Sequence, residues 1–179
     1  MTARECIVGR RSIRRFTDRP VPHSVLEEIV AVASYAPSWK NTQITRYVAL
    51  ENEKKERFAP CVASFPHNEA ILSGGAPMVV AVTILKGRSG VGGDGSYSTR
   101  RGDSWKMFDA GIASEAFCLA AYEQGLGTVI IGSFDDEKAA ALLELPQDRE
   151  VAALIAIGYP AEAPASPRRK AVAELLSYP

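Results

Sequence analysis

The apolar run from Ala76 to Leu85 is the feature that most constrains how this chain can fold. Ala76-Pro77 opens the run, and the β-branched residues that follow favour a strand buried on both faces at the centre of a sheet. The run is too short to cross a bilayer as a helix. Further strands are expected at residues 47–50, 128–131 and 151–158.

Helices are expected between these strands. Residues 105–124 give the longest, and its apolar positions cover so much of its circumference that it is expected to be central and largely buried. Ser24 and Glu27 have the spacing of a capping box and predict the start of another helix, which Pro37 would end. Shorter helices are expected at 3–9, 51–63, 135–143 and 171–176. Helices and strands follow one another without strict alternation, which favours the α+β class.

The 179 residues contain no repeat and no linker, so one domain, 1–179, is predicted. Residues 86–104 are a Gly-rich loop, and 160–179 a Pro-rich C-terminal arm. Gly90 to Gly95 matches G-x-G-x-x-G, but no helix opens directly after it, so a loop is favoured over a dinucleotide-binding turn.

The composition narrows the function. Lys plus Arg and Asp plus Glu both number 21, so no basic excess indicates nucleic acid or a membrane as partner. Polar residues follow Met1, and a cytoplasmic protein is expected. Three distant cysteines and two histidines, His23 and His67, predict neither a disulfide framework nor a metal site. His67 is expected in a loop.

The cationic residues are nevertheless distributed unevenly along the sequence. Residues 1–19 hold six arginines against only Glu5 and Asp18, which indicates a small anionic ligand or, alternatively, a solvated basic face. Residues 36–43, Ala-Pro-Ser-Trp-Lys-Asn-Thr-Gln, then place hydroxyl and amide side chains in a loop. Guanidinium and amide groups together suit a ligand with a phosphate at one end and a flat hydrogen-bonding ring at the other, such as flavin mononucleotide (FMN).

These segments resemble the nitroreductase family of flavin enzymes. The resemblance covers most of the chain. It rests on R-R-S-I-R-R-F at 10–16, A-P-S-W-K-N-T-Q at 36–43, D-A-G-I-A at 109–113, G-L-G-T at 125–128 and I-G-Y-P at 157–160. It implies a nitroreductase-like α+β fold, with a central mixed sheet flanked by helices, in an intertwined homodimer that shares two FMN sites.

The resemblance also implies roles for residues near the phosphate. Arg10 and Ser12, with Arg11 beside them, are expected to bind the phosphate and ribityl chain, together with Arg168 and Lys170 of the arm. Arg14 is expected near flavin N1, where a cation favours the reduced anion. A surface ion pair is the alternative for Arg14.

Other residues are implied around the ring. Ser38, Trp39, Asn41 and Gln43 are expected to approach it from the partner subunit, although Trp39 has a core role as its alternative. Asn68 is expected to reach the ring as well. The end of a strand is expected beneath it, with backbone amides facing N5 and O4; these residues are Ile130, Ile131, Gly132 and Ser133. Many relatives carry an acidic residue where Gly132 stands, which leaves the N5 contact open.

The activity implied is an oxidoreductase in which FMN takes hydride from NADH or NADPH at N5 and passes it to a nitroaromatic, a quinone or a similar small molecule, in a ping-pong scheme. No dedicated catalytic side chain is expected. The alternatives are a specialised relative, such as a reductive dehalogenase or a flavin-consuming oxidase, or a flavin-binding module without turnover. The sequence identifies neither the physiological acceptor nor the preferred nicotinamide, nor what loop 86–104 does.

Overall fold

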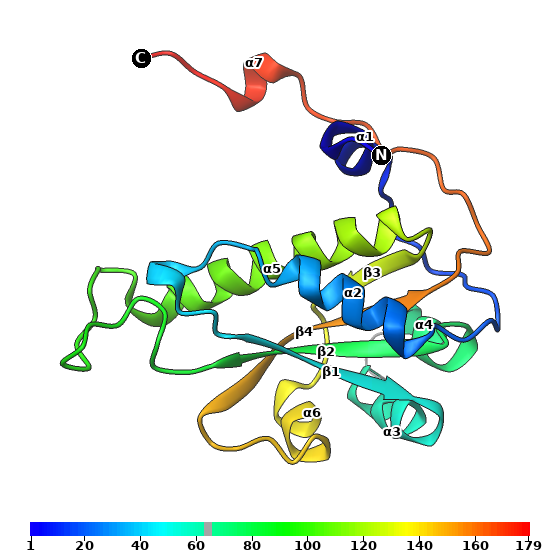
Figure 1. Cartoon of the computed structure of the whole chain (residues 1–179), viewed down its shortest axis with the longest axis horizontal. Helices are drawn as coiled ribbons and strands as arrows, with labels where there is room; N and C mark the ends of the chain where they lie inside the picture. Colours follow the sequence, from blue (N-terminus) through cyan, green and yellow to red (C-terminus); the bar gives the residue numbers. More distant parts are fainter. Residues whose placement is uncertain (63–65) are drawn as a thin grey trace.

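A four-stranded antiparallel sheet, in the order β1-β2-β4-β3, forms the centre of the molecule. The computed structural model describes residues 1–62 and 66–179 (Figure 1). The strands are β1 (Thr45–Glu51), β2 (Met78–Leu85), β3 (Gly127–Ile131) and β4 (Arg149–Gly158). The α+β class predicted from the sequence is confirmed.

Helices cover both faces of this sheet. In Figure 1, α2 and α5 lie on one face, with α3 and α6 on the other. The helices are α1 (Ala3–Gly9), α2 (His23–Ala33), α3 (Asn52–Val62), α4 (Pro66–Gly74), α5 (Trp105–Glu123), α6 (Asp136–Leu142) and α7 (Val172–Leu175), with short 3-10 turns η1 (Trp39–Asn41) and η2 (Gly102–Ser104).

Strand β2 explains why the fold has two cores. Its side chains alternate between the faces. Val80 and Val82 pack in one cluster with Phe117 of α5. Val79 and Ala81 pack in the other, with Phe58 of α3. The run, which is apolar except at Thr83, is therefore the strand buried on both sides, as its sequence predicts.

Several sequence expectations need correction. The three strand pairs are antiparallel, and among the described residues the parallel component of the expected mixed sheet is the isolated bridge between Ser12 and Thr128. Helix α2 begins at His23 after Pro22, without a side-chain cap, so the capping box at Ser24 does not form. The same helix ends at Ala33, before Pro37.

The region of α4 also differs from expectation. His67 was predicted in a loop, but its backbone belongs to α4. The helix predicted over 51–63 is α3, and its last predicted position, Ala63, lies outside the described residues.

Helix α5 is less buried than its composition suggests. Phe117 and Cys118 are buried against the sheet, but Met107 is 48% and Phe108 60% exposed. The helix is apolar around most of its circumference, and the other elements of the chain cover only one side of it.

The C-terminal arm leaves the body of the molecule after β4. Figure 1 shows it passing α1 and ending in α7, away from the sheet. Its apolar side chains are exposed, with Val172 at 71% and Tyr178 at 87%. Within the described part of the chain, no helix has the length and apolar character needed to cross a membrane.

Candidate functional site

The arginine segment, residues 10–16, crosses the end of the sheet where β3 begins. The N–H of Ile13 donates to the carbonyl of Thr128 at 2.9 Å, and Ser12 forms a parallel bridge to the same residue. A Cβ atom added to Gly127 would lie 2.6 Å from Cγ1 of Ile13. Only glycine at this position lets the segment approach the strand so closely.

Glu162, at the start of the C-terminal arm, fixes the second half of this segment. Its Oε1 accepts the backbone N–H groups of Arg14 at 2.6 Å and Arg15 at 3.2 Å. The N–H of Ala161 donates in turn to the carbonyl of Arg15 at 2.9 Å. The segment is therefore held between β3 on one side and the arm on the other.

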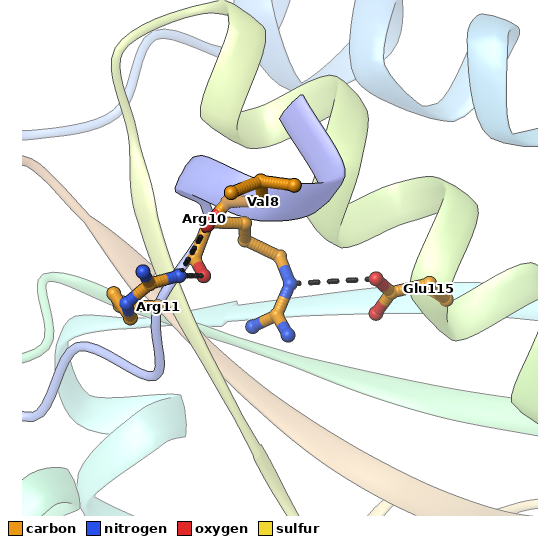
Figure 2. Close-up of polar contacts among 4 residues, drawn as sticks. All are labelled: Val8, Arg10, Arg11 and Glu115. Carbon is orange, nitrogen blue, oxygen red and sulfur yellow. Dashed lines mark hydrogen bonds and ion pairs between the residues drawn. The ribbon is translucent and has the colours of Figure 1, made fainter. Parts of the chain in front are cut away.

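Arg10 and Arg11 point in different directions (Figure 2). Nε of Arg10 lies 3.4 Å from the Glu115 carboxylate of α5, and it is buried without a hydrogen bond to any described residue. The terminal nitrogens of Arg10 point away from Glu115 in Figure 2. Nη1 of Arg11 instead donates to the carbonyls of Val8 and Arg10, both at 2.6 Å, so Arg11 caps the end of α1.

Arg14 borders a cavity. One of its guanidinium nitrogens donates weakly to the carbonyl of Ser12, at 3.4 Å. The cavity has a volume of about 680 Å³, and its lining includes Arg14, Arg15, Ala70 and Glu162. Its walls thus bring two guanidinium groups of the arginine segment beside α4.

The far end of β3 offers an open face. Ile130 is 44% exposed, whereas Ile131 is buried in the core cluster beneath the sheet. Nothing lies within 4 Å of the position that a Cβ on Gly132 would take. Nδ2 of Asn68 donates to the carbonyl of Ser133 at 3.0 Å, so α4 is tied to this strand end.

The two ends of β3 together suit an elongated ligand. The strand has five residues, which at about 3.3 Å per residue separate its terminal Cα atoms by about 13 Å. The arginine segment lies at one end, and the open face of Ile130 and Gly132 at the other.

The amide loop, residues 38–43, makes hydrogen bonds within itself. The N–H of Gln43 donates to Oγ of Ser38 at 2.9 Å, and the side-chain amide of Gln43 donates to Oδ1 of Asn41 at 3.2 Å. The ring of Trp39 packs against that of Trp105, with centroids 4.9 Å apart. Trp39 therefore has a packing partner in its own chain.

Within the described residues, no hydrogen bond or ion pair joins the amide loop to the arginine segment. The N–H of Trp39 donates to Asp109, near the start of α5. Gly9, next to Arg10, is so close to Tyr122, near the end of α5, that an added Cβ would lie 2.5 Å from its hydroxyl oxygen. Tyr122 stands thirteen positions after Asp109, about 20 Å along the helix, whereas Glu115, the ion-pair partner of Arg10, stands six positions after it, about 9 Å along the helix.

The cations of the C-terminal arm are also separate. Arg168 and Lys170 are exposed and lie beyond Pro164, where the arm has left the body. Neither forms an ion pair with another residue of the described chain.

The cysteines offer no nucleophile here. All three are free and buried. Burial raises the pKa of the Cys118 thiol to about 11, and the Thr128 side chain is its hydrogen-bond partner. Because a thiolate is the reactive form, a thiol with this pKa is inert at neutral pH.

The structure is that of an α+β protein: an antiparallel sheet covered by helices, with an arginine segment across one of its ends. Comparison with known proteins identifies the family. Residues 7–159 match the model of the Nitroreductase family, and the chain belongs to that family. The resemblance noted in the sequence is confirmed.

Individual relatives have low sequence identity to this chain, but they align with most of its length. An NADH dehydrogenase of Thermus thermophilus is 27% identical, over 90% of this chain and 88% of the relative. A nitroreductase family protein of Streptococcus pneumoniae superposes with a TM-score of 0.86, at 22% identity, over 99% of this chain and 100% of that one. A protein of Desulfovibrio desulfuricans crystallised with FMN is 29% identical, with a TM-score of 0.76 over 98% and 95% of the two chains.

Three carboxylates in these contacts are given no role from the sequence, although Asp109 opens the motif D-A-G-I-A. They are Asp109, Glu115 and Glu162, which hold the amide loop, Arg10 and the backbone of Arg14 and Arg15. Asp109 left a signal, because a carboxylate stands there among the apolar and small residues of a central helix. Glu115 and Glu162 left none, because their partners are distant in the sequence or are backbone groups.

Proposed function

We propose that this protein is an FMN-dependent oxidoreductase that works as a homodimer, uses NADH or NADPH as electron donor and reduces nitroaromatic, quinone or similar electrophilic acceptors. The observation that carries the proposal is the arginine segment laid across one end of β3, with an open face at the other end of the strand. The relative crystallised with FMN and the relative named as an NADH dehydrogenase support the same choice.

The residues present fit a phosphate. Arg10 has a buried Nε without a hydrogen bond, and its terminal nitrogens point away from its only ion-pair partner in the described chain. Ser12 stands two residues further on, beside β3. Guanidinium groups bind phosphate oxygens through charge-assisted hydrogen bonds, which are roughly twice as strong as neutral ones. Arg10 and Ser12 would hold the phosphate, and Arg11 would support them by capping α1.

The residues near the strand end fit a flat ring. Ile130 presents an exposed apolar side chain, and Gly132 adds no bulk beside it. The backbone amides of Gly132 and Ser133 would face the edge of the ring at N5 and O4. Asn68 holds the Ser133 carbonyl, which supports a role in orienting this strand end as well as in contact with the ring.

When bound, FMN supplies the redox chemistry, accepting two electrons as hydride at N5 and yielding them to the acceptor after the oxidised nicotinamide has left. Arg14 would stabilise the negative charge that the reduced ring carries. The only polar contact of its guanidinium in the described chain is the weak one to the Ser12 carbonyl, which leaves the charge available.

A second copy of the chain would complete the site. Ser38, Trp39, Asn41 and Gln43 belong to a loop that is held at Asp109 and that makes no hydrogen bond or ion pair with the arginine segment within the described chain. They would serve the FMN of the partner, with Asn41 and Gln43 pairing with the polar edge of the ring. Arg168 and Lys170 would reach the phosphate by the path of the arm around the dimer.

The test is an absorption spectrum of the purified protein, followed by anaerobic titration with NADH and NADPH. We expect a yellow protein whose flavin bleaches with either nucleotide and recovers when a quinone is added. A yellow protein that does not bleach would indicate a binding module without turnover. A colourless protein that takes up no added FMN would overturn the proposal.

A further inference from the structure

Asp109 is a buried carboxylate that the proposed function does not use. Its side chain belongs to α5, and the residue is 3% exposed. Both of its oxygens accept the same donor, the backbone N–H of Trp39, at 3.0 and 3.1 Å. No cation forms an ion pair with it within the described chain. Burying a carboxyl group with so few hydrogen-bond donors is costly, so an ordinary packing position would favour an apolar residue.

The loop that Asp109 holds has an unfavourable backbone. Lys40, Asn41 and Gln43 have positive φ angles of 45°, 57° and 46°. The left-handed region is sparsely populated by residues other than glycine, and such conformations persist only where the surroundings impose them. The Ser38 hydroxyl and the Asn41–Gln43 contact act within the loop, so neither fixes it to the rest of the molecule.

The hydrogen bond from Trp39 to Asp109 supplies that attachment. It joins the first residue of η1 to α5, and the Trp39–Trp105 ring contact lies beside it. Two polar atoms of the loop, Nε1 of Trp39 and Oγ1 of Thr42, are buried without a hydrogen bond to any described residue. Within the described chain, the hydrogen bond that joins the loop to α5 is therefore donated by the backbone of the loop and not by its side chains.

We propose that Asp109 is a positioning residue for the flavin site, and that it acts across the subunit interface. It sets the backbone of residues 38–43 in the conformation that presents Asn41 and Gln43 to the flavin bound by the partner chain. This inference rests on the proposed function, because the loop is given its role there. Asp109 itself touches neither flavin nor substrate.

The first test compares Asp109→Asn with Glu123→Gln, an exposed carboxylate at the end of the same helix. The asparagine keeps the shape of the side chain but loses its charge. We expect the dissociation constant of FMN to rise by about tenfold, with a changed visible circular dichroism of the bound flavin. Glu123→Gln should match the wild type in both. An unchanged dissociation constant and dichroism in Asp109→Asn would overturn the inference.

A heterodimer tests whether the effect crosses the interface. Chains carrying Asp109→Asn and chains carrying Arg10→Ala are co-expressed with different tags, and the mixed dimer is purified. If Asp109 serves the partner's flavin, one site combines an intact Arg10 with an intact Asp109 and recovers wild-type affinity, while the other carries both defects. If Asp109 serves its own chain's flavin, each site carries one defect and none recovers.

These outcomes separate the inference from the proposed function. If the wild-type protein binds no FMN, the function itself fails. If the wild type binds FMN and the heterodimer shows no recovered site, only the inference fails. Should Asp109→Asn not fold, Asp109→Ser replaces it in both tests, because serine removes the carboxylate that holds Trp39 and leaves a smaller polar side chain.

Discussion

Strand β2 and the C-terminal arm differ in how far other residues of the same chain bury their side chains. Every residue of β2 from Met78 to Ile84 is buried, between α5 on one face and α3 on the other. The arm exposes Leu175 at 70% and Tyr178 at 87%, and its cations form no ion pair in the described chain. The fold is thus completed within one chain. The proposed site is not, because its parts lie on surfaces that a second copy would have to cover.

Removing the arm gives the largest expected effect. A chain ending at Ala163 keeps Glu162 and the whole sheet, so its core should stay folded. It loses Arg168 and Lys170, whose proposed charge-assisted hydrogen bonds to phosphate would each contribute about 1.5–3 kcal/mol. We expect a monomer in analytical ultracentrifugation, with FMN affinity weakened on the order of a hundredfold or more.

The matched control for truncation is the full-length double variant Arg168→Gln, Lys170→Gln. It should remain a dimer and still lose FMN affinity, which separates the charges from the assembly. A truncated chain that stays dimeric and binds FMN like the wild type would remove the arm from the site.

Two phenylalanines of α5 test whether the face against the sheet contributes more to stability than the exposed face. Phe117 is fully buried, and Phe117→Ala should lower the free energy of unfolding by about 3–5 kcal/mol in urea titrations of the FMN-free protein. Phe108 is largely exposed in one chain, and Phe108→Ala should cost less than about 1 kcal/mol in the same assay. Equal losses would mean that the two sides of α5 are buried alike.

Two glycines of the β3 region test the contact between core and site. Gly127→Ala places a methyl group against Ile13 and should cost about 1–3 kcal/mol of stability, because the arginine segment must shift. FMN affinity should fall with it. Gly132→Ala meets open space and should change the free energy of unfolding by less than about 0.5 kcal/mol. Equal costs for the two variants would show that the close approach at Gly127 places no constraint on the segment.

The smallest effect concerns the ion pair of His23 with Glu51, whose Nε2 and Oε2 are 2.8 Å apart on the surface. The hydrogen bond to Glu51, with its charge, raises the pKa of His23 above its usual 6.5. The pair therefore contributes stability that is fully present below pH 6.5 and lost as the pH rises through the higher folded value. We expect Glu51→Gln to lower the urea midpoint more at about pH 6 than at about pH 8. Equal shifts at the two pH values would contradict this reading.

The sequence predicts the core better than it predicts the site. Periodicity and apolar runs identify β2, α5 and the class of fold, because the residues of each segment alone indicate which of its faces are buried. The sequence predicts no helix at α4, whose apolar pattern is weak. The expected cap of α2 is wrong because the helix begins at His23, one residue before Ser24, with Pro22 as its N-cap.

The candidate site residues are a different case. Which arginine points outward depends on distant partners, as with Glu115 for Arg10, and no local pattern contains that information. The separate attachments of the amide loop, at Asp109, and of the arginine segment, at Glu115 and β3, follow only from the tertiary structure. Their roles toward FMN remain predictions, which the variants above can test.

The account depends most on one claim, that FMN is held between two copies of this chain. Sedimentation velocity with simultaneous detection of protein and flavin absorbance measures it directly. We predict that the flavin signal sediments with a species of two chains and that each chain carries one FMN. Flavin sedimenting with a single chain, or no flavin sedimenting with protein at saturating FMN, would contradict the account.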